Sequence, residues 1–440
     1  MHNIAIALSQ KGHVITGSDD AIYEPSRSRL AKYKVLPSQM GWFPENITED
    51  LDAIILGMHA RADNPELQKA RQLGLKVYSY PEYIYEQSKE KNRVVIGGSH
   101  GKTTITSMIL HVLKTVGKKF DYLVGAQLEG FETMVQITDA PVMIIEGDEY
   151  LSSPIDRRPK FHLYHANIGV ISGIAWDHIN VFPTFDNYIK QFRIFLDTIE
   201  SDGYIIYNEL DPVVKDVVEN TNAPLKKIPY SIADNVTENG ITYLKVGQQN
   251  IALEIFGNHN LQNLEAARYV CHALNISDEQ FYKAISSFKG AAKRLELLGK
   301  NEHTAVYKDF AHSPSKLKAT INAVKQQYPD RELIAVMELH TFSSLNKDFL
   351  DEYSGCMDEA DTAVVFINRR TFEQKNMEPY DENRVKMAFN NNQLKFFNNS
   401  EILVEFLSYI NYKSKNLLLM SSGDFGGIDL NMLAEKALYI

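Results

Sequence analysis

The alternation of apolar and polar positions along the chain predicts short strands separated by helices. A helical pattern covers residues 2–10, and three apolar runs of strand length follow it, at residues 13–17, 53–57 and 75–79. Strands joined by helix-length segments are typical of a parallel βαβ arrangement. We therefore expect the first ninety residues to form a parallel α/β block that begins inside a βα unit, without a first strand and its glycine turn.

The same alternation continues in two further blocks, which begin at Arg93 and near Arg294. The second block has predicted strands at residues 93–96, 140–145 and 168–172, and the third at 304–307, 333–337, 362–367 and 416–420. Residues 231–247 look like a β-rich excursion, and helical patterns cover residues 261–274 and 315–327. The chain is expected to be an α/β protein of three domains, 1–92, 93–292 and 293–440, each a mostly parallel sheet flanked by helices.

A glycine-rich turn opens the second block. Residues 97–104 read Gly-Gly-Ser-His-Gly-Lys-Thr-Thr, directly after a predicted strand and before a helical pattern over 105–113. This order suits phosphate binding, because small residues let backbone N–H groups approach the phosphates and a helix N-terminus favours negative charge. Lys102 would reach the β- and γ-phosphates, and the Thr103 hydroxyl would hold Mg²⁺. Ile96 stands where the standard pattern has a glycine, so the loop is a shortened form, and a plain β–α turn is the alternative. The residues expected to bind the nucleotide here are Gly98, Ser99, His100, Gly101, Lys102, Thr103 and Thr104.

Further candidates follow the ends of the next two predicted strands. Glu146, Asp148 and Glu149 come after one strand, and His178 comes after the other. Because open parallel sheets place ligands at the carboxyl ends of their strands, we expect Lys102, Glu146 and His178 to face one crevice. Carboxylates and a neutral imidazole could hold a metal ion there. The alternatives are a solvated turn for the acids and an ordinary loop histidine for His178.

Polar residues near the third block offer a second set of candidates. His259 and Asn263 lie one helical turn apart, so they could contact an adenine edge or merely cap the helix. Arg294 could reach a phosphate from its linker, although a surface arginine is the usual case. Asp309 and His312 come at the end of another predicted strand.

The bulk composition narrows the class of protein. The chain has 440 residues, 44% of them apolar, a net charge of −10 and a pI near 5.8. It therefore lacks the overall basic character that nucleic acids or anionic membranes attract. No apolar run approaches membrane-spanning length, and the first ten residues show no secretory pattern. Cys271 and Cys356 fit no metal spacing and are expected to be buried thiols in a reducing compartment. Together with the missing span and secretory pattern, this predicts a cytoplasmic protein, and the net charge predicts no nucleic-acid or membrane partner.

Taken in order, these motifs resemble the Mur ligase family, the ATP-dependent enzymes that build the peptide stem of bacterial peptidoglycan. The matching segments are residues 98–104, 146–149, 177–178, 257–260 with Asn263, Arg294 and 309–312. Residues 16–19 and 63–66 also look like pieces of the family's UDP-sugar domain. The resemblance implies Rossmann-like N- and C-terminal domains and a P-loop central domain.

The resemblance also implies a reaction and roles for single residues. ATP would phosphorylate the lactyl carboxylate of UDP-N-acetylmuramate, and an amine would attack the resulting acyl phosphate. The residues implied in catalysis are Lys102, Glu146, His178 and Arg294, with Mg²⁺ held by Thr103, Glu146 and His178. ATP would also contact His259, Asn263, Arg294 and Asp309, and the substrates would contact Ser18, Asp19, Asn64 and His312.

Within the family, two substrate classes compete. Residues 146–150, 156–161 and 425–428 look more like the ligases that attach the tripeptide L-alanyl-γ-D-glutamyl-meso-diaminopimelate in peptidoglycan recycling. Ligases that add L-alanine usually have Ala second in the acidic motif, and they are the alternative. A nucleotide-binding protein that ligates nothing is a further alternative. The folylpolyglutamate synthetase relatives are another, but they lack a UDP-sugar domain of the kind that the first ninety residues are expected to form. Ser313 replaces a second His of many relatives, and Arg193 stands where some carry a carbamylated lysine, so no carbamylation is expected.

Overall fold

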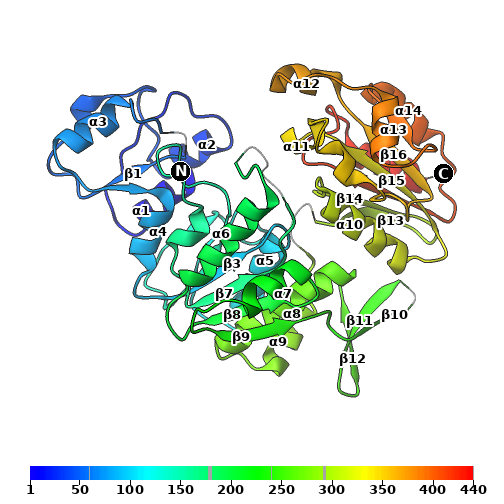
Figure 1. The fold of residues 1–440 in the computed structure, drawn as a ribbon, viewed down its shortest axis with the longest axis horizontal. Coiled ribbons are helices and arrows are strands. Elements are labelled where there is room, and N and C mark those ends of the chain that lie inside the picture. Colours follow the sequence, from blue (N-terminus) through cyan, green and yellow to red (C-terminus); the bar gives the residue numbers. More distant parts are fainter. Residues whose placement is uncertain (59, 177–180, 239, 291–293, 440) are drawn as a thin grey trace. The chain divides into compact units, whose positions relative to one another are not determined.

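The computed structural model of the chain describes residues 1–58, 60–176, 181–238, 240–290 and 294–439, which form two compact units (Figure 1). The first unit includes most of residues 1–231 together with Ala266–Phe281, and the second includes Ile232–Glu265 and most of residues 282–440. Each of the three predicted blocks contains a sheet that is wholly or mostly parallel. The predicted α/β class is therefore confirmed.

The N-terminal block is a small βαβ unit. Strands β1 (Ile54–Leu56) and β2 (Val77–Ser79) pair in parallel and are joined by α3 (Pro65–Gln72). The other helices of the block are α1 (His2–Gln10), α2 (Ser26–Lys32) and α4 (Tyr80–Ser88). The prediction of a strand at residues 13–17 is wrong, because Val14 is 96% exposed and the segment pairs with no strand in the described chain. An alternating pattern makes a strand only where a neighbour pairs with it and one face is buried.

The first unit is built on a seven-stranded sheet with β3 in its centre. In spatial order the strands are β5 (Val135–Gln136), β4 (Asp121–Leu123), β6 (Val142–Glu146), β3 (Asn92–Gly97), β7 (Ile168–Ile171), β8 (Tyr204–Asn208) and β9 (Lys226–Tyr230). β4 and β5 pair antiparallel, and the other neighbours pair in parallel. The helices that follow the N-terminal block are α5 (Lys102–Thr115), α6 (Phe185–Asp197), α7 (Pro212–Glu219), α8 (Asn258–Ala273) and α9 (Asp278–Ile285).

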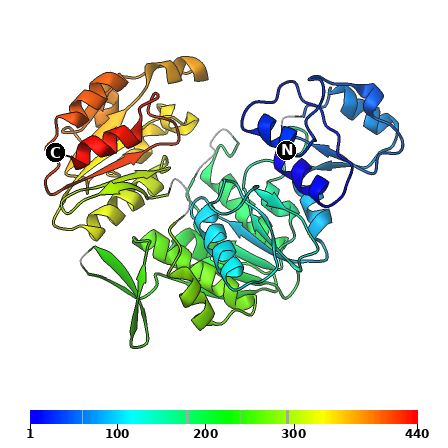
Figure 2. The same cartoon turned by 180° about the vertical axis from the view of Figure 1, so that it is seen from behind.

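Both faces of β3 are buried, as the apolar run at residues 93–96 predicts. One face shares a core with α1, α4, α6 and α7, in which Val95 and Ile171 are fully buried. On the sheet lies α5, drawn in cyan in Figure 2, and its Ile105 and Ile109 are fully buried. This packing fixes the strand and the helix that flank the glycine-rich turn.

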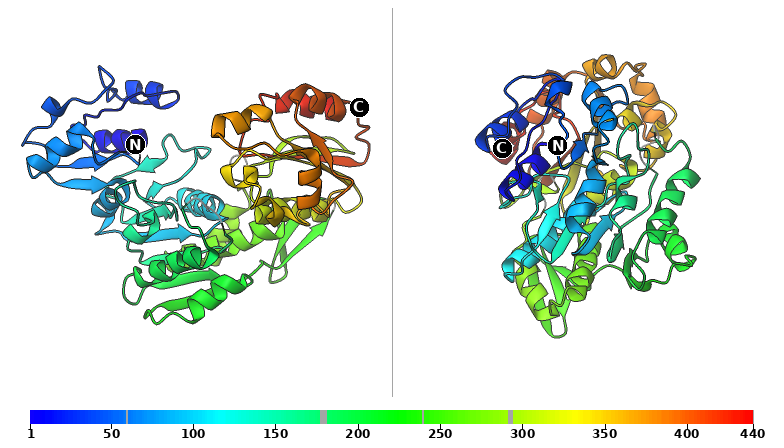
Figure 3. Two further views of the ribbon diagram at one scale, coloured as in Figure 1. Left: turned by 45° about the horizontal axis from the view of Figure 1, so that its top comes forward. Right: turned by 90° about the vertical axis from the view of Figure 1, so that its left-hand side faces the viewer.

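The second unit is built on a six-stranded sheet with helices on both faces (Figure 3). In spatial order the strands are β13 (Glu296–Lys300), β14 (Ala305–Asp309), β18 (Lys415–Met420), β15 (Glu332–Glu338), β16 (Thr362–Phe366) and β17 (Lys395–Phe397). One core includes side chains of α10 (Pro314–Gln327), α11 (Phe342–Leu345), α12 (Arg369–Lys375) and α13 (Glu382–Ala388), and the other those of α14 (Ser400–Ser408) and α15 (Leu430–Leu438). Ala335 belongs to the first core and Val336 to the second, as the period of two in a strand requires.

The predicted β-rich excursion is confirmed as an antiparallel sheet of β10 (Asn235–Glu238), β11 (Ile241–Val246) and β12 (Gln249–Leu253). Thr242 Oγ1 donates to Gln327 Oε1 at 2.9 Å, which ties this sheet to α10 within the second unit. Predicted strands of the second and third blocks agree with the structure within two residues at each end. Cys271 and Cys356 are buried thiols, as predicted. None of the helices in the described ranges has the length and apolar content to cross a membrane.

Candidate active site

The predicted phosphate loop connects β3 to α5, and two of its glycines adopt backbone conformations that other residues rarely take. Gly98 has φ +134° and Gly101 has φ +79°. A Cβ atom on Gly98 would lie 2.2 Å from the hydroxyl oxygen of Ser172, just beyond β7. Gly101 occupies the N-cap of α5, and no side chain of the described residues caps this helix. Its first-turn N–H groups therefore lack a side-chain acceptor, which suits an anionic ligand.

Lys102, the first residue of α5, directs its ammonium group back over the loop. Its Nζ donates to the Gly98 carbonyl oxygen and, at 2.6 Å, to Glu149 Oε2. The side chain of Lys102 is 15% exposed and that of Glu149 only 1%. Burial alone would lower the pKa of Lys102, but the carboxylates of Glu149, Asp148 and Glu146 outweigh burial and raise it. Lys102 is therefore a fixed cation at the start of the loop helix.

Glu146, at the end of β6, lies beside the first turn of α5. Its Oε1 accepts from Thr103 Oγ1 at 2.7 Å, and its Oε2 accepts from the Gly125 backbone N–H at 2.8 Å. A carboxylate and a hydroxyl are the hard oxygen ligands that Mg²⁺ uses, and phosphates and water usually complete its shell. Thr103 and Glu146 therefore fit a magnesium ion shared with a nucleotide. Nowhere in the described ranges, this site included, is a group of three or more His, Cys, Asp or Glu side chains arranged to hold a metal.

The other two acids of the motif have cationic partners. Asp148 Oδ2 accepts from Lys160 Nζ at 2.7 Å, whereas Glu149 pairs with Lys102. Burial opposes ionisation of Asp148, but the two lysines outweigh burial and lower its pKa. The structure thus distinguishes three acids that local sequence alone does not separate.

Tyr188, on α6, is a neighbour of the loop that the sequence reasoning missed. Its hydroxyl donates to Glu149 Oε1 at 3.2 Å and lies 2.8 Å from Ser99 Oγ. Ser99 Oγ in turn accepts from the Ala175 N–H at 2.9 Å. Tyr188 is fully buried and lies 39 positions from Glu149 in sequence, so no local motif could have identified it. This network links the phosphate loop to the acidic motif and to the segment after β7.

The remaining predicted residues lie in several places. His178 lies outside the described residues. Arg294 and Asp309 come together in the second unit, where the Arg294 guanidinium lies over the Phe310 ring, 5.1 Å from its centroid. Burial raises the pKa of Asp309, and the positive charge of Arg294 offsets only part of that rise. Asp309 accepts from the backbone N–H groups of Leu295 and Ala311, each at 2.6 Å. It therefore anchors the start of β13 whatever else it binds.

Other predicted contacts have structural partners of their own. His312 Nδ1 lies 2.8 Å from the Phe310 carbonyl oxygen. On α8, Asn263 is buried and His259 is partly buried. In the N-terminal block, Ser18 Oγ donates to Glu66 Oε1 at 2.7 Å, the Asp19 carbonyl accepts from the Gly41 N–H, and Asn64 Oδ1 caps α3. The ligand roles of these residues stay predictions.

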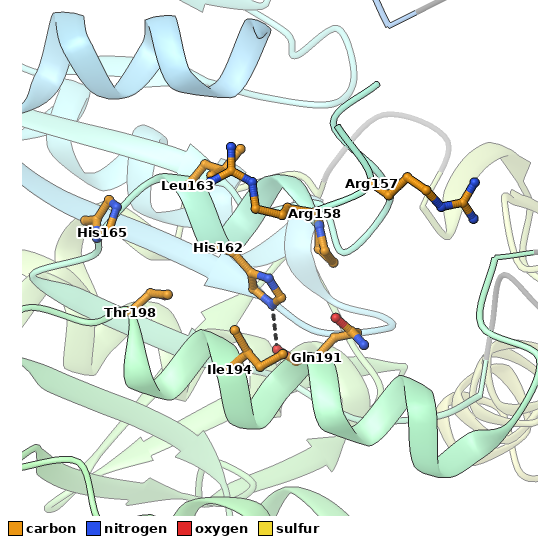
Figure 4. A pocket seen from close by; sticks show the side chains of 9 residues that line it. Arg157, Arg158, His162, Leu163, His165, Gln191, Ile194 and Thr198 are labelled. Carbon is orange, nitrogen blue, oxygen red and sulfur yellow. Dashed lines mark hydrogen bonds between the residues drawn. The ribbon is translucent and has the colours of Figure 1, made fainter. Parts of the chain in front are cut away.

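A hollow of about 570 Å³ lies between α6 and the segment that precedes β7 (Figure 4). Its lining residues are Arg157, Arg158, Pro159, His162, Leu163, His165, Gln191, Ile194 and Thr198. His162 Nε2 contacts the Gln191 carbonyl oxygen at 2.7 Å, and Arg158 pairs with Glu82 and Asp156. In Figure 4, Arg157 points away from His162. Its polar groups do not converge and it contains none of the predicted site residues, so it does not coincide with the predicted nucleotide site at the glycine-rich loop.

Comparison with known proteins agrees with the motifs. Residues 96–271 match the Mur ligase middle domain, and residues 293–423 match the Mur ligase glutamate ligase domain. The chain is 31% identical over 378 aligned positions to the UDP-N-acetylmuramate–L-alanine ligase of Caldicellulosiruptor bescii, covering 83% of this chain and 80% of that protein.

Two further proteins resemble the chain over its whole length. The UDP-N-acetylmuramate–L-alanyl-γ-D-glutamyl-meso-2,6-diaminoheptandioate ligase of Haemophilus influenzae is 26% identical over 454 aligned positions, covering 100% of this chain and 97% of that protein. The solved murein peptide ligase of Psychrobacter arcticus has a TM-score of 0.64 at 21% identity, covering 100% and 97%. At this identity the solved structure shows the shared fold. With two matched domains and a relative above 30% identity over most of its length, the chain belongs to the Mur ligase family, whose members are ATP-dependent ligases that form amide bonds.

Proposed function

We propose that this ligase joins the lactyl carboxylate of UDP-N-acetylmuramate to the amino group of L-alanyl-γ-D-glutamyl-meso-diaminopimelate, in peptidoglycan recycling. The observation that carries the phosphoryl-transfer chemistry is the arrangement at the ends of β3 and β6. There, Lys102 and the Thr103–Glu146 pair lie on one glycine-rich loop and its neighbour strand. This is the set of groups that a phosphoryl transfer needs.

The choice of tripeptide is supported by sequence. Residues 146–150, 156–161 and 425–428 look like ligases of that kind, and the Haemophilus influenzae ligase of that kind is 26% identical to the chain. An L-alanine ligase is the second candidate, favoured by the higher identity of 31% to the Caldicellulosiruptor bescii enzyme.

The proposed reaction begins with activation, because a carboxylate is a poor electrophile. A carboxylate oxygen attacks the γ-phosphorus of ATP, the bond from that phosphorus to the bridging oxygen breaks, and ADP leaves. The amine then attacks the acyl carbon, and the tetrahedral intermediate collapses to the amide and inorganic phosphate, with loss of the amine proton. Lys102 would offset charge on the transferring phosphoryl oxygens. Mg²⁺ held by Thr103 and Glu146 would supply further positive charge there.

Other roles in this reaction are proposals that rest on the family resemblance. His178 would hold a second Mg²⁺, while His259, Asn263, Arg294 and Asp309 would contact ATP. Ser18, Asp19, Asn64 and His312 would contact the substrates. Single substitutions of the residues assigned to Mg²⁺ or ATP should raise the KM for ATP. Single substitutions of the residues assigned to the substrates should raise the KM for UDP-N-acetylmuramate or peptide.

One experiment separates the candidate functions. The protein is incubated with Mg²⁺, ATP and UDP-N-acetylmuramate, together with either L-alanine or the tripeptide, and the products are weighed by mass spectrometry. We expect the tripeptide adduct to form with release of one phosphate per adduct. An L-alanine adduct alone would replace the substrate assignment and keep the chemistry. ATP binding without any adduct would favour the nucleotide-binding protein that ligates nothing.

A further inference from the structure

Glu149 forms an ion pair with the ammonium group of Lys102, the group that would otherwise contact the phosphates of a nucleotide. Its Oε2 accepts from Lys102 Nζ at 2.6 Å, and its Oε1 accepts from the Tyr188 hydroxyl at 3.2 Å. The Glu149 side chain is 1% exposed, so water screens the pair very little. Glu149 is therefore the internal anion of the loop.

The γ-phosphate of ATP would need the same ammonium group. Lys102 has three N–H donors, and the Gly98 carbonyl and Glu149 take two of them. If phosphate and Glu149 both contacted Nζ at charge-assisted distances of about 2.8 Å, the two anions would lie within roughly 6 Å of each other. In a buried site this repulsion is strong, so the two anions compete.

We propose that Glu149 is a positioning residue that holds the Lys102 ammonium in this buried ion pair and yields it to the γ-phosphate when ATP binds. The inference rests on the ATP-dependent reaction proposed above. Glu149 should add the largest cost to nucleotide binding, because it contacts the Lys102 ammonium directly, whereas Asp148 and Glu146 act on it through space. Asp148 differs because its carboxylate contacts Lys160 instead.

The test is the affinity of a non-hydrolysable ATP analogue with Mg²⁺, measured by calorimetry in the full-length protein. Glu149→Gln keeps the shape of the side chain and its contact with Tyr188 but removes the charge. We expect the analogue to bind about tenfold more tightly, the size of one charge-assisted hydrogen bond. The matched control is Asp148→Asn, which removes a charge from the same motif but leaves the Lys102–Glu149 contact, and it should change the affinity by less than about threefold.

Steady-state kinetics provide a second readout. In Glu149→Gln the KM for ATP should fall while kcat does not rise, because ground state and transition state gain the same contact. If Glu149→Gln does not fold, Glu149→Ala serves with the same expected tightening. An unchanged or weaker affinity in the folded variant, or an equal gain in Asp148→Asn, would overturn the inference. If the unsubstituted protein binds the analogue and forms product in that case, only this inference fails; if it binds no nucleotide, the proposed function fails with it.

Discussion

Thr103 Oγ1 lies 2.7 Å from Glu146 Oε1, although 43 positions separate the two residues in sequence. The contact forms because β6 pairs in parallel with β3, with Glu146 in register with Ile96. The carboxylate therefore lies beside the helix that begins after the loop. Since parallel strands bring their carboxyl ends to one edge, the contact marks where a metal and a phosphate can meet.

Substitution of Glu146 should raise the magnesium requirement of the reaction. In Glu146→Gln, a neutral amide replaces the charged ligand, so we expect at least about a hundredfold loss of turnover at low Mg²⁺, the scale of a lost transition-state charge contact. Phosphate release, followed as Mg²⁺ is titrated, measures this effect. Glu132→Gln, at an acid that pairs with exposed Lys32, is the control and should behave as the unsubstituted protein. A normal Mg²⁺ profile in Glu146→Gln would contradict the metal assignment.

Loss of Lys102 should affect both activity and stability. Lys102→Met leaves the Glu149 carboxylate, which is 1% exposed, without its cation. Breaking a buried pair in this way costs about 3 kcal/mol of unfolding free energy, and ligation should fall by at least about a hundredfold. Urea unfolding and substrate-dependent phosphate release measure the two effects.

The double variant Lys102→Met/Glu149→Gln separates these two losses. It should recover most of the stability, because no unpaired charge remains, but none of the activity. Amide formation near the unsubstituted rate in either variant would remove Lys102 from its proposed role.

Gly98→Ala should disturb the loop through geometry alone. Its φ of +134° is unfavourable for alanine, and the new methyl group would lie 2.2 Å from Ser172 Oγ. We expect a loss of about 1–3 kcal/mol in unfolding free energy and a higher KM for ATP. Gly117→Ala is the control, because Gly117 has φ +72° but open space around it, and it should lower stability without affecting the KM. Equal effects of the two substitutions on the KM would argue against a shaped phosphate loop.

Stability should depend on pH through His162. Burial lowers the pKa of His162 in the folded chain to about 4, against an ordinary value of 6.5. As the pH falls below 6.5 the unfolded chain takes up a proton that the folded chain resists, so the stability present above pH 6.5 is lost progressively down to pH 4. The difference between the two pKa values corresponds to about 3 kcal/mol at most.

Thermal unfolding between pH 4 and 7 tests this dependence. His162→Gln should show a flatter profile than the unsubstituted protein, whereas His13→Gln, at an exposed histidine, should not. Parallel profiles for His162→Gln and the unsubstituted protein would show that another group controls the acid sensitivity.

Local patterns were sufficient to predict most of the helices and strands and the position of the glycine-rich turn between β3 and α5. The strand at residues 93–96 and the helix after it are both rich in apolar residues, and only a few glycine-rich positions separate them in sequence. Their order alone therefore predicts a turn between them. The run at residues 13–17 has a similar alternation but forms no strand, and Val14 is 96% exposed. Strand formation depends on a neighbour and a buried face, and neither is encoded in the segment itself.

The amino-acid sequence also revealed the family resemblance, because several separated motifs follow one another in the order that the family shows. It did not show which partner each of the three acids in residues 146–149 contacts. Glu146 contacts Thr103, Asp148 contacts Lys160 and Glu149 contacts Lys102 only because parallel pairing and the packing of α6 bring distant side chains to one edge of the sheet. Tyr188 belongs to the same network for the same reason. Partner choice among like charges is a property of three-dimensional proximity and burial, which no spacing along the chain can express.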